Sequence, residues 1–390
     1  MKILSIETSC DETAVSIVEA TGEFPIATYE ILGNALHSQI EAHKEFGGVF
    51  PTVAKREHIK TILPIFEAAL EEAGMLTSSS SELELEIVEK LHTLLIREEG
   101  LVDELITFLE NHDIAKLDLI AVTSGPGLEP ALWVGINFAK ALAMVLHIPL
   151  VPINHMEGHI LASIYDVVKD NEIAEVRFPA ISLLISGGHT ELVLMKSWAL
   201  YEKIGQTKDD AVGEAFDKVA RMIGLSYPGG PEIGKRAKIA REQKLPPFKA
   251  DMPRPMIHSK DLDFSFSGIK TSVRNAIAGK ELSDNDINAL SRDFEDAVTE
   301  VLLKKTQDAL TAYGAQTLIV GGGVSASSYI REIFLTQLLK SHPDVEVYFP
   351  QPKLSTDNSI MIALSGHARK DSARTAGAVA LIQADGNKSL

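Results

Sequence analysis

Two histidines of the segment Asn154-His155-Met156-Glu157-Gly158-His159 are four residues apart. Side chains four apart on a helix stand on one face, so both imidazoles could ligate one ion. Spacing alone is also typical of paired structural histidines. The glutamate occupies the third position rather than the one beside the first histidine, so the pattern differs from that of zinc peptidases.

A carboxylate is still needed to complete a site of two histidines and one acid, which leaves positions open for substrate oxygens. Asp357, in Ser355-Thr356-Asp357-Asn358, follows a glycine-rich element and precedes an expected helix. It is therefore the candidate third ligand. The same position suits a helix N-cap equally well, and the sequence leaves both roles open.

Glycine-rich turns form a second group of candidates. Gly187-Gly188 and Gly321–Gly323 lack side chains, so their backbone N–H groups could converge on a phosphate. Glycine pairs also make ordinary turns. Neither segment matches a P-loop or the spaced glycines of a dinucleotide-binding strand. A nucleotide site built between two hairpins is the interpretation that remains.

An acidic segment, Asp209–Lys218, begins an expected helix. Acids at a helix start usually stabilise only the helix dipole. Asp217 would share a face with Glu214, and in a cleft it could accept hydrogen bonds from ribose hydroxyls. The following loop, Tyr227–Pro231, either approaches a ligand closely or simply turns a corner.

The elements that must position these residues alternate between short β-rich runs and helical segments, which predicts an α/β fold. Strands at 2–6 and 14–18 flank one polar turn, and strands at 180–185 and 191–195 flank another. We interpret the pair as a duplication, with each lobe opening on a hairpin that faces a cleft. Chance similarity of two short hairpins would give the same pattern.

The length of 390 residues favours two domains or one duplicated plan. We place the N-terminal lobe at 1–150 and the C-terminal lobe at 151–390. Expected helices cover 57–73, 131–147, 209–224, 290–312 and 359–369, and the last is expected to pack back on the N-terminal lobe. Segment 77–111 is predicted to be an inserted helical hairpin with an acidic outer face, most simply a solvated decoration.

Composition narrows the class of protein. The net charge of −17 argues against coating nucleic acid by bulk electrostatics. One cysteine, Cys10, excludes an intrachain disulfide framework. No apolar run approaches the roughly 20 residues of a membrane span, and Met1 leads straight into an apolar strand without a targeting pattern. We therefore expect a cytoplasmic protein without a membrane partner.

Taken together, these segments resemble the bacterial form of the tRNA N6-adenosine threonylcarbamoyltransferase family, over nearly the whole chain except 77–111. Each piece is weak alone, but ten in the family's order are specific. The matching pieces are Ile6–Thr13, Gly47–His58, Gly125–Leu128, Asn154–His159, Ser186–Thr190, Gly213–Lys218, Pro228–Pro231, Phe264–Thr271, Gly321–Ala326 and Thr356–Asn358.

The resemblance implies two duplicated actin-like lobes of the sugar-kinase superfamily, with nucleotide and metal in the cleft between them. It implies iron or zinc at His155, His159 and Asp357, one ion per subunit. The threonylcarbamoyl-AMP substrate would contact Leu184, Ile185, Ser186, Gly187, Gly188, Asp217, Gly230 and, at the usual nucleotide-contacting position, Ser327. The group would pass to N6 of the adenosine 3′ of the tRNA anticodon, releasing AMP. Implied partners are tRNA, a paralogous non-catalytic subunit and a small ATPase.

Three departures from the family pattern bear on these expectations. Ser327 stands where the family has asparagine, so that nucleotide contact is shortened or lost. Leu128–Ala131 replaces Gly-Leu-Val-Gly, which alters a helix start. The insertion at 77–111 bears on docking of the paralogous subunit.

For the chemistry, we expect Asp11 or Glu12 in the first hairpin turn to accept the amine proton, with capping or ion pairing as the alternative role. A basic stretch with ten Lys and Arg, 235–274, lies within a predicted helical insertion at about 225–290 and is the candidate tRNA surface, although such lysines more often only solubilise helices. Competing interpretations are an actin-like phosphotransferase, a metallopeptidase, and a non-catalytic scaffold subunit of a tRNA-modifying complex.

Overall fold

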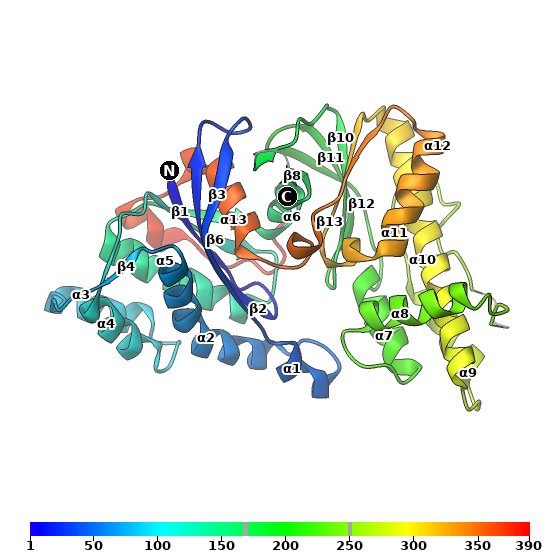
Figure 1. The fold of residues 1–390 in the computed structure, drawn as a ribbon, viewed down its shortest axis with the longest axis horizontal. Coiled ribbons are helices and arrows are strands. Elements are labelled where there is room, and N and C mark those ends of the chain that lie inside the picture. Colours follow the sequence, from blue (N-terminus) through cyan, green and yellow to red (C-terminus); the bar gives the residue numbers. More distant parts are fainter. Residues whose placement is uncertain (167–170, 249–251) are drawn as a thin grey trace. The chain divides into compact units, whose positions relative to one another are not determined.

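A computed structural model describes residues 1–166, 171–248 and 252–390. The chain divides into two compact units (Figure 1). Unit 1 comprises Met1–His43, Val49–Ala174 and Asp357–Leu390, and unit 2 comprises Lys44–Gly48 and Glu175–Thr356. The sequence predicts the boundary between the two lobes at residue 150. Unit 1 instead continues to Ala174, because the strand that starts at Leu150 pairs with a strand of the first sheet.

Unit 1 is built on a seven-stranded mixed sheet in the order β7-β6-β1-β2-β3-β9-β8. β1 is antiparallel to β2 and parallel to β6, which is parallel to β7. Its strands are β1 (Lys2–Glu7), β2 (Glu12–Thr21), β3 (Thr28–Ser38), β6 (Leu119–Gly125), β7 (Leu150–Asn154), β8 (Tyr165–Asp166) and β9 (Glu172–Ile173). Its helices are α1 (Ile40–His43), α2 (Pro51–Glu72), α3 (Leu85–Leu94), α4 (Leu101–Asn111), α5 (Glu129–Leu146), α6 (His155–Ile164), α13 (Ser359–Ala368), and the 3-10 turns η5 (Lys370–Ser372) and η6 (Ala376–Leu381).

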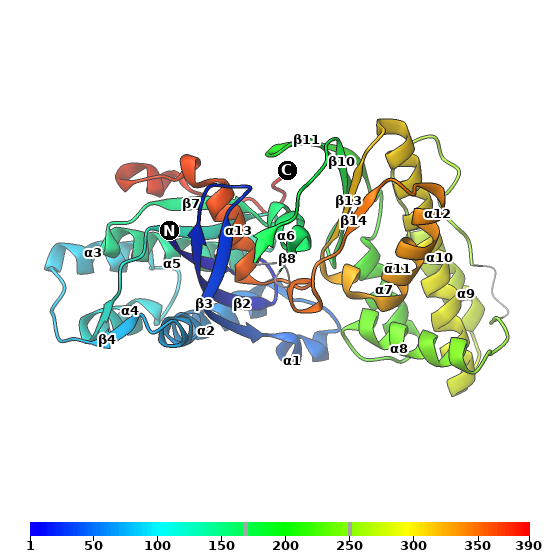
Figure 2. The ribbon, with the colours of Figure 1, turned by 45° about the horizontal axis from the view of Figure 1, so that its top comes forward.

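The alternation of side chains along β1 assigns the two faces of this sheet. Leu4 and Ile6 join the apolar core that α2 and α5 complete. The opposite face carries Ile3, against which Gly366 of α13 packs. The last helix, α13, therefore covers the face of the first sheet on which Glu7 also lies. Figure 2 shows β1–β3 in blue with α13 in orange beside them.

The segment 77–111 contains α3 and α4, and its ends are joined by a two-stranded sheet of β4 (Leu76–Ser78) and β5 (His112–Ile114). Leu91 and Leu105 turn inward to the core of unit 1. The helical hairpin therefore shares the apolar core of this unit on its inner side.

Among the described residues, one helix, α5, is long and apolar enough by length and composition to cross a membrane. Two thirds of it (67%) is buried inside the protein, where Phe138 packs edge-on against Phe66 of α2. That burial is typical of a core helix.

Unit 2 has a five-stranded sheet in the order β12-β11-β10-β13-β14. β10 is antiparallel to β11 and parallel to β13, and β13 is parallel to β14. Its strands are β10 (Ala180–Ile185), β11 (Thr190–Ser197), β12 (Leu200–Gln206), β13 (Thr317–Gly321) and β14 (Glu346–Tyr348). Its helical segments are η1 (Lys44–Phe46), α7 (Val212–Met222), α8 (Gly229–Glu242), α9 (Ser267–Ile277), α10 (Asp284–Tyr313), η2 (Gly323–Ala326), α11 (Ser328–Ile333), the π-helix η3 (Phe334–Leu338), α12 (Leu339–Ser341) and η4 (Pro352–Leu354).

The basic stretch 235–274 lies in unit 2, and several of its cations already face acids. Arg236 pairs with Asp284 at 3.2 Å, and Arg241 contacts Glu295 at 2.6 Å, so α8 is tied to α10. Arg254, Lys238 and Lys270 also form ion pairs. Lys249, part of the same prediction, lies outside the described residues. These pairs reduce the charge that the stretch offers to a phosphate backbone.

Candidate metal centre and glycine-rich turns

Three parallel strands of unit 1, β1, β6 and β7, end at the same edge of the sheet. In α/β sheets the carboxyl ends of parallel strands are where ligands bind. Glu7 is the last residue of β1, and α6 begins at His155 directly after β7. Asn154 caps this helix by accepting a hydrogen bond from Met156 N at 2.9 Å. The strand edge and the cap together fix where the first turn of α6 points.

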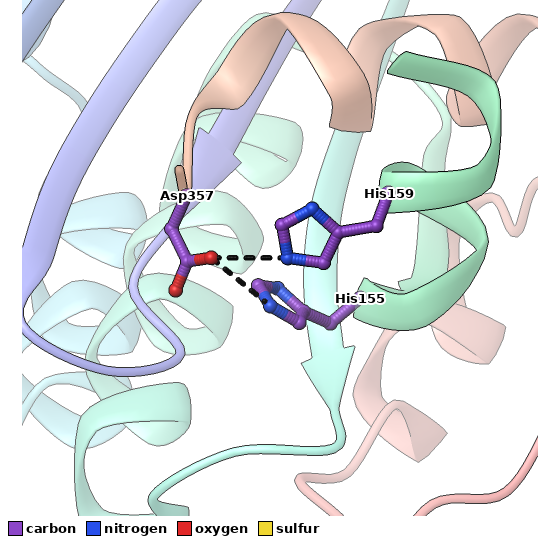
Figure 3. A group of neighbouring side chains, drawn as sticks. All are labelled: His155, His159 and Asp357. Atoms are coloured by element: carbon purple, nitrogen blue, oxygen red, sulfur yellow. Dashed lines mark ion pairs between the residues drawn. The ribbon is translucent and has the colours of Figure 1, made fainter. Parts of the chain in front are cut away.

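At this edge the structure brings His155, His159 and Asp357 together (Figure 3). Asp357 Oδ1 lies 3.4 Å from His155 Nε2 and 3.1 Å from His159 Nε2. One potential ligand atom from each residue lies within 4.8 Å of the others. The two imidazoles come from one helical face, as their spacing predicts, and the carboxylate comes from the residue with which the chain re-enters unit 1.

The alternative role of Asp357, as a helix N-cap, is taken by its neighbour. Asn358 is the N-cap of α13, and its side chain accepts a hydrogen bond from Met361 N at 3.0 Å. Asp357 is consequently left to face the two histidines.

Glu7 holds His155 from the other side of the imidazole ring. Its fully buried carboxylate lies 3.1 Å from His155 Nδ1 and accepts hydrogen bonds from Ser9 N and from Thr123 Oγ1, both at 2.6 Å. Burial would raise the pKa of Glu7, but the adjacent His155 outweighs burial and lowers it. An ionised Glu7 accepts a hydrogen bond from Nδ1–H of His155 and thereby leaves Nε2 as the atom that faces Asp357, the arrangement common to metal-bound histidines.

The electrostatics of the cluster suit a cation. Burial disfavours a charged His155, yet the carboxylates of Asp357 and Glu7 raise its pKa well above the ordinary value. Burial likewise opposes ionisation of Asp357, but the two histidines lower its pKa. His159 Nε2 is buried and makes no well-formed hydrogen bond among the described residues, although Asp357 lies beside it. Two ionised carboxylates and an unsatisfied imidazole nitrogen fit a divalent ion better than they fit the protein alone.

Asp11 lies in the hairpin turn between β1 and β2, and Glu12 is the first residue of β2, in the same unit as the three-residue cluster. Burial raises the pKa of Asp11, and burial together with the neighbouring Asp11 raises the pKa of Glu12 well above its usual range. The two side chains are hydrogen-bonded to each other. Two carboxyl groups this close do not readily ionise together, so their titrations are linked.

A buried histidine supports this turn from beneath. His58 Nε2 donates to the carbonyl of Cys10 at 3.1 Å, and His58 Nδ1 lies 2.8 Å from Thr13 Oγ1. Burial lowers the pKa of His58 to about 4, so the ring stays neutral above that pH. Sequence reasoning noted His58 only as part of a motif.

In unit 2 the two glycine-rich turns lie together. β10 and β13 are parallel neighbours, with Leu184 opposite Gly321, so the turns after Ile185 and after Gly321 share one sheet edge. Gly322 has φ +91°, and a Cβ there would lie 2.4 Å from the carbonyl oxygen of Ile185. Only glycine allows this approach. The helix α7 begins against the first turn, since Gly213 N donates to Ser186 O at 3.1 Å.

Gly187 and Gly188 themselves have open space where a side chain would be, with no atom within 4 Å of an added Cβ. Their N–H groups and the nearby N-terminus of α7 are groups that attract anions. Packing within this structure therefore does not explain why residues 187 and 188 are glycines.

Asp217 has a structural task that its sequence position did not reveal. Its Oδ1 accepts a hydrogen bond from Gly229 N at 2.7 Å and so fixes the start of α8, where Gly230 is open to its surroundings. Asp217 also lines a cavity of about 310 Å³ with Arg221 and Tyr227.

Ser327 caps α11 by accepting a hydrogen bond from Ile330 N at 3.3 Å, and its hydroxyl lies 3.5 Å from Glu295 Oε1. The residue that replaces the family's asparagine is thus engaged with its own helix.

Glu7 was not singled out as a site residue from the sequence, although an acid that ends a buried strand beside a polar turn was a usable signal.

The fold and the site define an α/β protein with two sheets of related strand order and a candidate metal centre at the carboxyl edge of the first. The family model described as TsaD, tRNA N6-adenosine threonylcarbamoyltransferase, matches residues 30–80 and 86–364. The chain is 40% identical to a tRNA N6-adenosine threonylcarbamoyltransferase of Dictyoglomus turgidum, over 94% of this chain and 93% of that one. It is 38% identical to one of Persephonella marina, over 96% and 92% respectively.

The chain belongs to the tRNA N6-adenosine threonylcarbamoyltransferase family, a family of transferases that modify tRNA. The resemblance found in the sequence is confirmed, and so is the α/β class. Among solved structures, full-length HypF is similar with a TM-score of 0.46 and 13% identity, over 70% of this chain and 42% of that one.

Proposed function

We propose that this chain transfers the threonylcarbamoyl group from threonylcarbamoyl-AMP to N6 of the adenosine 3′ of the tRNA anticodon, releasing AMP. Membership of the family supports the reaction class. The observation that carries the proposal is the convergence of His155, His159 and Asp357 from segments far apart in the sequence, because a scaffold subunit would have no need of it.

For the metal, we propose iron or zinc held by His155, His159 and Asp357, with Glu7 orienting His155. Both ions accept imidazole nitrogen and carboxylate oxygen. Such an ion, when bound, supplies Lewis acidity and a template for substrate oxygens. The paired imidazoles count against the phosphotransferase alternative, since kinases hold magnesium through carboxylates and phosphates.

For the nucleotide, we propose contacts from unit 2 at Leu184–Gly188, Asp217 and Gly230. The N–H groups of Gly187 and Gly188 would stabilise charge on the departing phosphate. Ser327 would make at most a short contact, because its hydroxyl is engaged as the cap of α11. The matching strand orders β7-β6-β1-β2-β3 and β14-β13-β10-β11-β12 support an actin-like duplication.

The reaction forms a bond between adenosine N6 and the carbamoyl carbon and breaks the bond from that carbon to the phosphate oxygen, which leaves with AMP. N6 must lose one proton. We propose that the Asp11–Glu12 pair accepts this proton, since a raised carboxyl pKa gives a stronger base than an exposed acid.

tRNA is the substrate of the family, and we keep 235–274 as its proposed surface on this chain, with the ion pairs to α10 limiting how many cations take part. A paralogous non-catalytic subunit, a small ATPase and a cytoplasmic location remain predictions from the resemblance.

The decisive experiment supplies purified protein and its partner proteins with tRNA, threonine, bicarbonate and ATP, and analyses the nucleosides by mass. Threonylcarbamoyladenosine should appear, and it should disappear with the Asp357→Ala variant. A protein stripped of metal that keeps full activity would contradict the metal assignment. The absence of modified nucleoside with the unaltered, metal-loaded protein would contradict the function.

A further inference from the structure

Glu157 sits between the two histidines of α6 and has no part in the site described above. Successive residues of a helix are about 100° apart, so Glu157, two residues from each histidine, projects about 160° around the helix axis from both of them. Its carboxylate is nevertheless buried, with 4% of the residue exposed. A buried carboxylate needs a specific partner.

That partner is Arg369, the C-cap residue that follows α13. Arg369 Nε lies 3.0 Å from both carboxylate oxygens of Glu157, and Arg369 Nη2 lies 2.8 Å from Oε1. Planar, multiply hydrogen-bonded Arg–carboxylate pairs fix orientation as well as distance. A cation at this end of a helix also complements the helix dipole.

The two helices meet closely between these contacts. A Cβ at Gly158 would lie 3.0 Å from Met361 Cγ and 3.2 Å from Ile362 Cδ1, so the backbone of α6 packs directly on α13. Asp357 precedes α13 and contacts His155 and His159, whereas Arg369 follows α13 and contacts Glu157. Contacts at the two ends of α13 therefore hold the start of α6. Asp357 contacts the side of α6 that carries the two histidines, and Arg369 contacts the opposite side.

We propose that the Glu157–Arg369 pair is a positioning device for the metal centre. It fixes the rotation of α6 on α13 at which the two imidazoles and the Asp357 carboxylate meet. The proposal rests on the proposed metal site, but not on the identity of the group that is transferred. Helices that share only apolar contacts can slide or rotate by fractions of an ångström, and ligand sets tolerate little of this.

The test is Zn²⁺ affinity of the purified full chain, measured by chelator competition, with the visible spectrum of the Co²⁺-loaded protein as a second readout of ligand geometry. Glu157→Gln and Arg369→Gln should each weaken Zn²⁺ binding by about 10- to 100-fold, the range found for groups that orient metal ligands. The double variant should be no worse than the poorer single variant, because the two residues act as one pair.

Lys370→Gln is the matched control. Lys370 is the next cation along the chain and pairs with Glu23, which is largely exposed. This variant should bind Zn²⁺ within about twofold of the unaltered protein, as expected for a surface pair. Arg369→Lys keeps the charge but loses the planar geometry and should fall between Arg369→Gln and the unaltered protein, which provides a milder variant should Glu157→Gln fold poorly.

Folded variants, by circular dichroism and melting temperature, that bind Zn²⁺ as tightly as the unaltered protein and give the same Co²⁺ spectrum would overturn the positioning role. A protein whose Zn²⁺ affinity is unchanged by Asp357→Ala would overturn the metal site itself, and the positioning proposal with it. Failure of the nucleoside assay alone would overturn neither.

Discussion

The two sheets of this protein share a strand order but differ in the residues at the carboxyl ends of their parallel strands. β7-β6-β1-β2-β3 in unit 1 corresponds to β14-β13-β10-β11-β12 in unit 2, with the same parallel and antiparallel pairings around β1 and β10. Unit 1 presents ionisable side chains at the carboxyl edge, among them Glu7 and His155. Unit 2 presents Gly187, Gly188 and Gly322 at the equivalent edge.

The two sheet edges therefore offer different chemical groups to a ligand. Side-chain ligands gather charge at one point and suit a metal ion. Backbone N–H groups on glycine turns spread partial positive charge and suit a phosphate. The strand order supplies the edge in both units, and the few residues after each strand decide its chemistry.

The largest effect on the difference between the two units is expected from a change at Asp357. Asp357→Ala should abolish stoichiometric metal binding and lower turnover about 10³-fold, because it removes several kcal/mol of charge stabilisation. Metal content by elemental analysis and nucleoside mass spectrometry check this. Asp371→Ala, an exposed acid of the same unit, is the control. Equal activity in the two variants would remove the metal from the mechanism.

Lowering the pH should destabilise unit 1 through the buried His58. The pKa of His58 is lowered from 6.5 to about 4, so the unfolded chain binds a proton that the folded chain does not between these values. The contribution of His58 to the free energy of unfolding is fully present above pH 6.5, and about 3 kcal/mol of it is lost as the pH drops to 4. Urea unfolding at several pH values should show this loss, and His58→Gln should lack it. His37→Gln, at an exposed position, should retain it.

A single methyl group tests the glycine edge of unit 2. Gly322→Ala should lower stability by about 1–3 kcal/mol and weaken AMP binding, because the backbone has φ +91° and Ile185 O blocks the Cβ. Gly323→Ala, next along the chain with nothing within 4 Å of its Cβ, is the matched control. Calorimetric melting and AMP titration measure both effects. Equal behaviour of the two variants would argue against a close contact between the turns.

The smallest effect is expected at the basic stretch. Lys238→Glu should weaken tRNA binding modestly and reduce the slope of log affinity against log salt by about 1, since one phosphate contact is lost. Lys196→Glu, an exposed lysine of β11 in a comparable ion pair with Glu202, should leave the slope unchanged. An identical slope for both variants would indicate that tRNA binds at another surface of the protein.

Local features of the fold were predictable from the sequence, because their causes are local. The hairpins around Glu7–Thr13 and Ser186–Thr190 follow from alternating strands and polar turns, and β1, β2, β10 and β11 lie where expected. The helix that carries His155 and His159 follows from their spacing. Longer-range relations were not accessible in this way. The extent of unit 1 depends on how β7 pairs, and β3 (Thr28–Ser38), which pairs with β2 in the first sheet, was not among the expected strands.

The site shows the same division. Asp357 was a candidate from its position before a helix, but only the structure separates its role from that of Asn358, one residue away. The contacts of Glu7 with Thr123 and His155 span more than 100 residues, and Glu157 finds Arg369 across 212. A single sequence carries no record of such pairings.

Unit 1 is assembled from three stretches of chain, and the last of them begins at Asp357. During synthesis the strands β1 to β7 emerge first, with the face that contains Ile3 and Ala121 bare until α13 arrives to cover it. A nascent chain therefore carries this sheet face through the whole production of unit 2, and Asp357 joins His155 and His159 only afterwards. The proposed metal centre is accordingly completed late in the synthesis of this polypeptide.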